Sequence, residues 1–227
     1  MARLIEIEIR ESPLTYTNQR SWAFHPTGHH VRELLRHHLG RGYVLDGSTK
    51  FSVIFGPRPK QEEPLNTLLG VTWCYIEDFD VGDYMLRPVE IQQESILNEL
   101  TKALLKAASA VGSDTAAITD AANAVRESGF AEEITIDKLA CATKDRRLWV
   151  RANRCLGPRI GECWEARVFD SDSAVIGNDP MTACPHYLNC TDRFSKSTIG
   201  ETLYQITSNR TGSIEYTLNL LPYLDNR

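Results

Sequence analysis

The sequence predicts an α+β fold, with mostly antiparallel β-sheet in the N- and C-terminal parts and a central two-helix hairpin packed on it. Three observations carry this prediction: strand-like alternation near the start, helical periodicity from 88 to 129, and a return to short strands from 133. No linker or shift of composition interrupts the chain. We therefore expect a single domain over 1–227, strand-rich over 1–87, helical over 88–129 and strand-rich over 130–227.

The first third of the chain shows the pattern of a sheet with one helix. Residues 3–9 alternate isoleucine with charged residues, as expected for a strand with one solvated face. A histidine-rich helix is predicted over 28–39, ended by Gly40. Further strands are predicted over 50–55 and 68–76, separated by a loop that contains Gly56 and several prolines.

The rest of the chain shows two helices and then strands. Pro88 favours a helix start, apolar residues recur at helical spacing up to Gly112, and a second helix follows from about 114 to Gly129. Turn residues then separate the predicted strands over 133–142, 146–155, 162–169, 173–177 and 213–220.

Composition limits the classes of function. The chain has 227 residues, 42% of them hydrophobic, so it can bury a full core. A formal charge of −5 disfavours nucleic acid as the main partner, because such binding depends on Lys and Arg neutralising phosphates. The alternating residues at the start predict neither a secretory signal nor a membrane anchor. We therefore expect a soluble cytoplasmic protein with no membrane partner.

The six cysteines have two interpretations. In a cytoplasmic chain we expect them to be reduced thiols that behave as small hydrophobic residues. The alternative is a zinc site, although the spacings are irregular for paired zinc ligands. Its ligands would come from Cys155, Cys163, Cys184, His186 and Cys190.

Five of the six histidines lie between His25 and His38. At about 100° per residue, His30, Glu33 and His37 share one face of the predicted helix and could bind one divalent metal ion. Zincins place their histidines four residues apart, however, whereas His30 and His37 are seven apart. A solvated helix face is the alternative interpretation, and we expect no cofactor unless this metal is bound.

A basic segment and an acidic segment suggest a surface for a charged partner. Residues 138–159 contain seven Lys or Arg against a single acidic residue, and on a strand Arg147, Trp149 and Arg151 project from one face. Alternatively, Trp149 is a core residue and the arginines pair with glutamates on neighbouring strands. Asp78 and Asp80 belong to the acidic segment 77–83, which could bind a basic partner surface. The alternative interpretation is that these aspartates only stabilise a turn.

Taken together, these patterns favour a non-enzymatic soluble protein that binds a macromolecule, which we expect to be a protein. Such a chain would be an inhibitor, an immunity-type antidote or an assembly component. No local catalytic motif is present. One alternative is a metal-dependent hydrolase built on His30, Glu33 and His37. A second alternative is a binder of single-stranded nucleic acid that uses Arg147, Trp149 and Arg151.

Overall fold

The computed structural model describes the backbone of residues 2–15 and 18–224 and the side chains of 2–15 and 23–224. The predicted α+β class with mostly antiparallel sheets is confirmed. The chain forms two compact units, Met1–Ala131 and Glu132–Arg227. The single domain expected over 1–227 stays a prediction, which cooperative unfolding of the whole chain would test. In the described part of the chain, no helix has the length and apolarity needed to cross a membrane.

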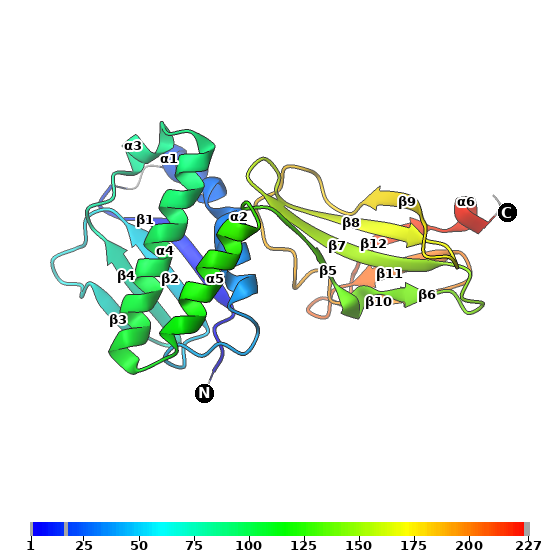
Figure 1. Cartoon of the computed structure of the whole chain (residues 1–227), viewed down its shortest axis with the longest axis horizontal. Helices are drawn as coiled ribbons and strands as arrows, with labels where there is room; N and C mark the ends of the chain where they lie inside the picture. Colours follow the sequence, from blue (N-terminus) through cyan, green and yellow to red (C-terminus); the bar gives the residue numbers. More distant parts are fainter. Residues whose placement is uncertain (1, 16–17, 225–227) are drawn as a thin grey trace. The chain divides into compact units, whose positions relative to one another are not determined.

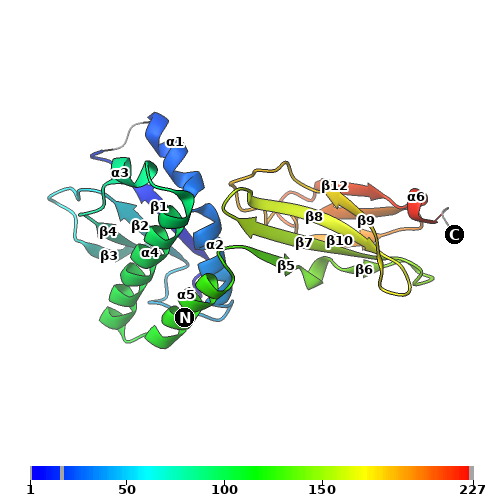
Figure 2. The same cartoon turned by 45° about the horizontal axis from the view of Figure 1, so that its top comes forward.

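Among its described residues, the first unit contains a four-stranded sheet and five helices (Figures 1 and 2). Its strands are β1 (Glu6–Glu11), β2 (Lys50–Phe55), β3 (Leu65–Leu68) and β4 (Val71–Ile76). Its helices are α1 (Asn18–Thr27), α2 (His29–His38), α3 (Val81–Met85), α4 (Val89–Val111) and α5 (Thr115–Glu127).

This sheet differs locally from the predicted antiparallel arrangement. Its strand order is β1-β2-β4-β3, and the pairs β1–β2 and β2–β4 are parallel. The parallel pairing of β1 and β2 follows from the chain between them, because α1 and α2 carry it back to the starting edge of the sheet. β3 and β4 form an antiparallel pair joined at Leu69 and Gly70, which both have positive φ.

One face of the first sheet packs under helices. Side chains at alternate positions of β1, β2 and β4 are buried, among them Ile9, Val53 and Cys74. α4 contacts β4 and α2 contacts β1, while α5 packs against both of these helices (Figure 1). Gly28 precedes α2, and a Cβ there would collide with Ile9 and press on Ile96 of α4. The lack of a side chain at Gly28 therefore lets α2 approach both the sheet and α4.

In this unit one helix was not predicted and one strand prediction is wrong in detail. The unpredicted helix is α1, in which Pro26 interrupts the pattern that indicates a helix. The single strand expected over 68–76 is in fact the end of β3, a turn and β4. The sequence did not indicate this turn, because Leu69 has positive φ there and leucine rarely adopts that conformation.

The second unit contains two antiparallel sheets and a short C-terminal helix. One sheet has the order β5-β7-β8-β9 with β6 paired to β7, and the other has the order β10-β11-β12. Their bounds are β5 (Glu132–Thr135), β6 (Cys141–Ala142), β7 (Trp149–Gly157), β8 (Gly161–Phe169), β9 (Val175–Pro180), β10 (Lys196–Ile199), β11 (Leu203–Thr207) and β12 (Ile214–Asn219). A 3-10 turn (Asp137–Leu139) follows β5, and α6 (Leu221–Leu224) follows β12.

The core of this unit holds a buried ion pair. Apolar side chains of both sheets pack together, including Trp164 and Phe194 with ring centroids 5.0 Å apart. Glu162, which is fully buried, accepts hydrogen bonds from Trp164 Nε1 at 2.6 Å and from the backbone N–H of Cys190 at 3.0 Å. Its second carboxylate oxygen lies 2.5 Å from the Arg154 guanidinium. The carboxylate thus joins β7, β8 and the segment before β10.

A disulfide corrects the expectation of six reduced thiols. Cys163 and Cys184 are bonded to each other, with Cα atoms 5.7 Å apart. This bond also disfavours the alternative zinc site, because it removes two of the five candidate ligands and leaves three, where structural zinc takes four. The remaining cysteines are free thiols.

Candidate functional site

A strip of exposed aromatic and basic side chains crosses the outer face of the second unit's larger sheet. Trp149 on β7 pairs in register with Phe169 on β8, which in turn pairs with Val175 on β9. Trp149 is 40% exposed and Val175 is 56% exposed. The Arg151 guanidinium carbon lies 4.9 Å from the centroid of the Phe169 ring. We call Trp149, Arg151, Phe169 and Val175 the Trp149 surface.

The sequence places these side chains outward through strand alternation. Arg147, Trp149 and Arg151 are exposed, whereas Leu148 and Val150 between them are buried in the core. The alternative in which Trp149 is a core residue is therefore wrong. The proposed pairing of arginines with glutamates is correct for one arginine of the segment, since Arg154 pairs with Glu162 on the neighbouring strand. Glu133 pairs instead with Arg167, which lies outside the segment.

The turn before β7 presents more positive charge beside Trp149. Lys144, Arg146 and Arg147 are exposed there, and Asp145 forms an ion pair with Arg147. Hydrogen bonds from Thr143 and from the N–H and guanidinium of Arg147 lower the pKa of Asp145 to about 2. Asp145 therefore stabilises the turn and neutralises one of its three cations.

A small hollow adjoins the Trp149 surface. It has a volume of about 280 Å³ and is lined by Trp149, Arg151, Phe169, Ser171 and Ser173. The loop that carries the two serines is held by Asp170, whose carboxylate accepts from the N–H groups of Asp172 and Ala174 at 2.9 Å each. The Asp-Ser-Asp sequence at 170–172 therefore forms a turn stabilised by the first aspartate.

The predicted acidic residues Asp78 and Asp80 lie in the first unit, after β4. Asp78 is exposed, and Asp80 caps α3 by accepting a hydrogen bond from the Asp83 N–H at 3.0 Å. Two neighbouring acids are paired, Glu77 with Arg58 and Asp83 with Arg87. Much of the acidic segment is therefore neutralised within the unit, and its role in partner binding stays a prediction.

The predicted metal ligands on α2 are not brought together. His30 is 1% exposed, and its Nε2 lies 3.2 Å from Gln93 Oε1 on α4, whereas His37 is exposed. Glu33 is buried next to the Arg32 guanidinium. The expected solvated helix face is wrong, because the first two turns of α2 are buried on all sides. The metal site on this helix stays a prediction that the arrangement of these three side chains does not favour.

Two other histidines, the buried His29 and the half-buried His25, contact the Arg32 guanidinium. The guanidinium lies 3.1 Å from His25 Nε2 and 3.0 Å from His29 Nδ1, so these ring nitrogens accept hydrogen bonds. Burial, followed by the charges of Arg32 and His29, lowers the pKa of His25 to about 4. Burial lowers the pKa of His30 to about 4 as well, against the opposing effect of Gln93. The imidazoles of His25 and His30 are therefore uncharged at neutral pH.

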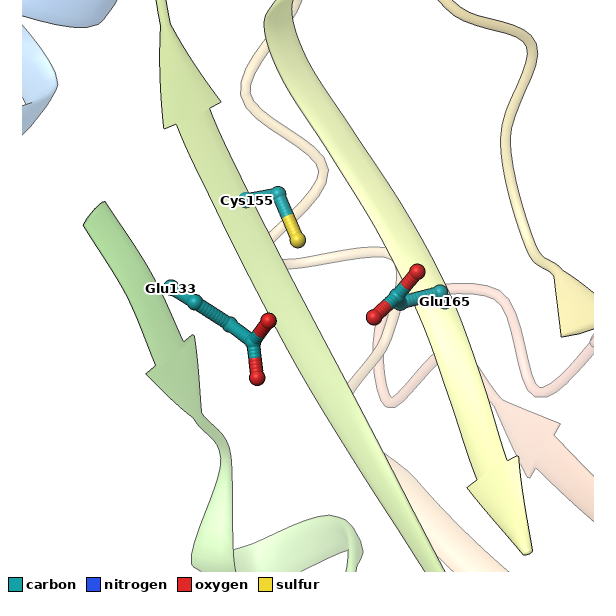
Figure 3. Close-up of side chains that lie close together, drawn as sticks. All are labelled: Glu133, Cys155 and Glu165. Atoms are coloured by element: carbon teal, nitrogen blue, oxygen red, sulfur yellow. The ribbon is translucent and has the colours of Figure 1, made fainter. Parts of the chain in front are cut away.

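Among the described residues, one group of three metal-ligand side chains has donor atoms within 4.8 Å of one another: Glu133, Cys155 and Glu165 (Figure 3). They extend from β5, β7 and β8. Arg167, however, forms ion pairs with both carboxylates, including a bond of 2.7 Å from its guanidinium to Glu133 Oε1. An arginine therefore already provides the positive charge that a metal ion would bring.

Cys155 in this group is expected to react slowly. Burial and the charges of Glu165 and Glu133 raise the pKa of its thiol to about 11, against the effect of Arg167. The thiolate fraction is then roughly a hundredfold smaller than in a free thiol. Alkylation by iodoacetamide at pH 8, followed by peptide mapping, should be correspondingly slow at Cys155 and faster in Glu165→Gln. Equal rates in both proteins would show that this carboxylate does not control the thiol.

A larger hollow of about 880 Å³ lies on the outer face of the first sheet. Among its lining residues, Lys50 Nζ lies 3.1 Å from Glu6 and 3.2 Å from Glu8, and the Tyr75 hydroxyl donates to Glu62 at 2.6 Å. The lysine and these three carboxylates therefore have partners within the same unit. The walls include Trp73 and Leu69.

The fold and the site thus define an α+β protein with an aromatic and basic strip on a β-sheet. Comparisons with protein-family models, with curated proteins and with solved structures found no match to this chain.

Proposed function

We propose that this chain is a non-enzymatic binding protein, whose partner is another protein held by the Trp149 surface. The supporting observation is the exposed Trp149 on the same face as Arg151, whose guanidinium makes a cation–π contact with Phe169. Trp and Arg are the residues most enriched among those that dominate binding energy in protein interfaces. Strand pairing holds Trp149 and Phe169 in place, so little ordering would accompany binding.

The surroundings of the Trp149 surface favour an acidic partner. The adjoining turn carries Lys144, Arg146 and Arg147 against Asp145. A partner of opposite charge would be attracted and oriented by these groups. Roles that fit are an inhibitor, an immunity-type antidote or an assembly component. A cytoplasmic location stays a prediction, and the Cys163–Cys184 bond favours an oxidising compartment instead.

Site-specific crosslinking tests the proposal. A photoreactive phenylalanine analogue at Ser173, beside the hollow, is expected to crosslink one protein from native lysate in near-equimolar yield. The same analogue at Leu203, which is 41% exposed on β11, provides the control. The proposal requires that the crosslink from position 173 disappear when Trp149→Ala is added. Absence of a specific crosslinked protein at position 173, or an undiminished crosslink after Trp149→Ala, would reject it.

A further inference from the structure

The hollow beside Arg151 offers unused hydrogen-bond donors next to apolar walls. In the described part of the chain, Arg151 makes a cation–π contact with Phe169 and no ion pair, whereas Arg147, Arg154 and Arg167 each pair with a carboxylate. The guanidinium carbon lies over the Phe169 ring, and in the described part of the chain no hydrogen bond engages the guanidinium N–H groups. The N–H groups around its edge are left for a ligand.

We propose that this hollow binds a carboxylate of the partner protein, with a neighbouring apolar side chain of that partner lying against Trp149. This inference rests on the proposed function. A guanidinium edge matches the two oxygens of a carboxylate, and the Ser173 hydroxyl lines the same hollow. The aromatic walls suit the apolar group that accompanies the carboxylate.

The size and charge of the hollow define the ligand further. A volume of about 280 Å³ accommodates one side chain or a chain end rather than a larger organic molecule. The carboxylate would come from Asp, Glu or a C-terminus. A phosphate of single-stranded nucleic acid is the competing anion, but the net charge of −5 disfavours a polyanion.

Four probes separate these ligands. Acetyl-Glu-Phe-amide presents a side-chain carboxylate, acetyl-Phe presents a terminal carboxylate, acetyl-Gln-Phe-amide is the uncharged control, and a ten-residue oligothymidylate presents phosphates. Binding is followed by NMR through the indole N–H signal of Trp149, assigned by its loss in Trp149→Phe. We expect at least one carboxylate peptide to shift this signal to saturation at millimolar concentration. Added NaCl should weaken that binding.

Matched variants identify the residue responsible. Arg151→Gln is expected to weaken binding of the carboxylate peptide about tenfold, because a charge-assisted bidentate contact is lost. Arg210→Gln, another exposed arginine of the same unit, should leave the dissociation constant unchanged. The carboxylate proposal is contradicted if neither acetyl-Glu-Phe-amide nor acetyl-Phe binds more tightly than acetyl-Gln-Phe-amide, if Arg151→Gln has no effect, or if oligothymidylate binds more tightly than both carboxylate probes.

The same variants separate this inference from the proposed function. A crosslinked partner that requires Trp149 but tolerates Arg151→Gln would overturn the carboxylate contact alone. A crosslinked partner whose binding is unchanged in both Trp149→Ala and Arg151→Gln would overturn the proposed binding surface as well.

Discussion

Acidification from pH 7 to pH 4.5 is expected to destabilise the first unit by about 2–3 kcal/mol through His30 alone. Its pKa is lowered from 6.5 to about 4 in the folded chain, chiefly by burial. Between these values the unfolded chain binds the proton and the folded chain does not. Stability is therefore complete above pH 6.5 and is lost as the pH falls towards 4. His25 adds a smaller loss of the same sign, because its ring is partly solvated.

The test is urea unfolding followed by circular dichroism at pH 7 and pH 4.5. His30→Gln has no titrating group at position 30. Between pH 7 and pH 4.5 this variant should therefore lose less stability than the wild type, by the contribution of His30. His37→Gln removes an exposed histidine from the same helix and should retain the wild-type pH dependence. If His30→Gln and the wild type lose equal stability, His30 is not buried in its neutral form.

Replacement of Glu162 by Leu is expected to destabilise the second unit by about 3–5 kcal/mol. The variant leaves the buried Arg154 guanidinium without its ion pair, and it removes the acceptor for the Trp164 indole N–H and the Cys190 backbone N–H. Each buried donor without a partner adds a desolvation penalty.

Two further variants make this prediction specific. Glu215→Gln removes the partner of Arg193, which is 57% exposed, and should cause a much smaller loss of stability, because a solvated ion pair contributes little. Arg154→Met combined with Glu162→Leu removes both charges and should recover part of the loss. All are measured by urea unfolding. Equal small losses for Glu162→Leu and Glu215→Gln would mean that the buried pair does not contribute as its environment implies.

Local pattern predicted the elements best where one periodicity continued without interruption. The long helix, the following helix and the alternation from Arg147 to Arg151 all appear as expected, because each depends on neighbours along the chain. β10 and β11 were missed, and parallel pairing in the first sheet was not foreseen. Strand pairing is set by contacts distant in sequence, which periodicity does not report.

Only the part of the candidate site that lies on a single strand could be predicted from the sequence. Alternation on β7 places Trp149 and Arg151 outward, but Phe169 and Val175 join them through cross-strand register. The prediction for the histidine-rich helix was wrong because charged and imidazole side chains usually indicate a solvated face. Here Gln93 and Arg32 provide the hydrogen-bond partners of the histidine rings within the unit. Gln93, on a different helix, carried no signal of this role in the sequence.

The most direct test of the central claim is the dissociation constant between the crosslinked partner and three proteins: the wild type, Trp149→Ala and Leu203→Ala. Both altered side chains are about equally exposed on the second unit. The Trp149 surface predicts a loss of about 30-fold or more for Trp149→Ala, corresponding to at least about 2 kcal/mol, and a change within about twofold for Leu203→Ala. Wild-type affinity in Trp149→Ala would contradict the account.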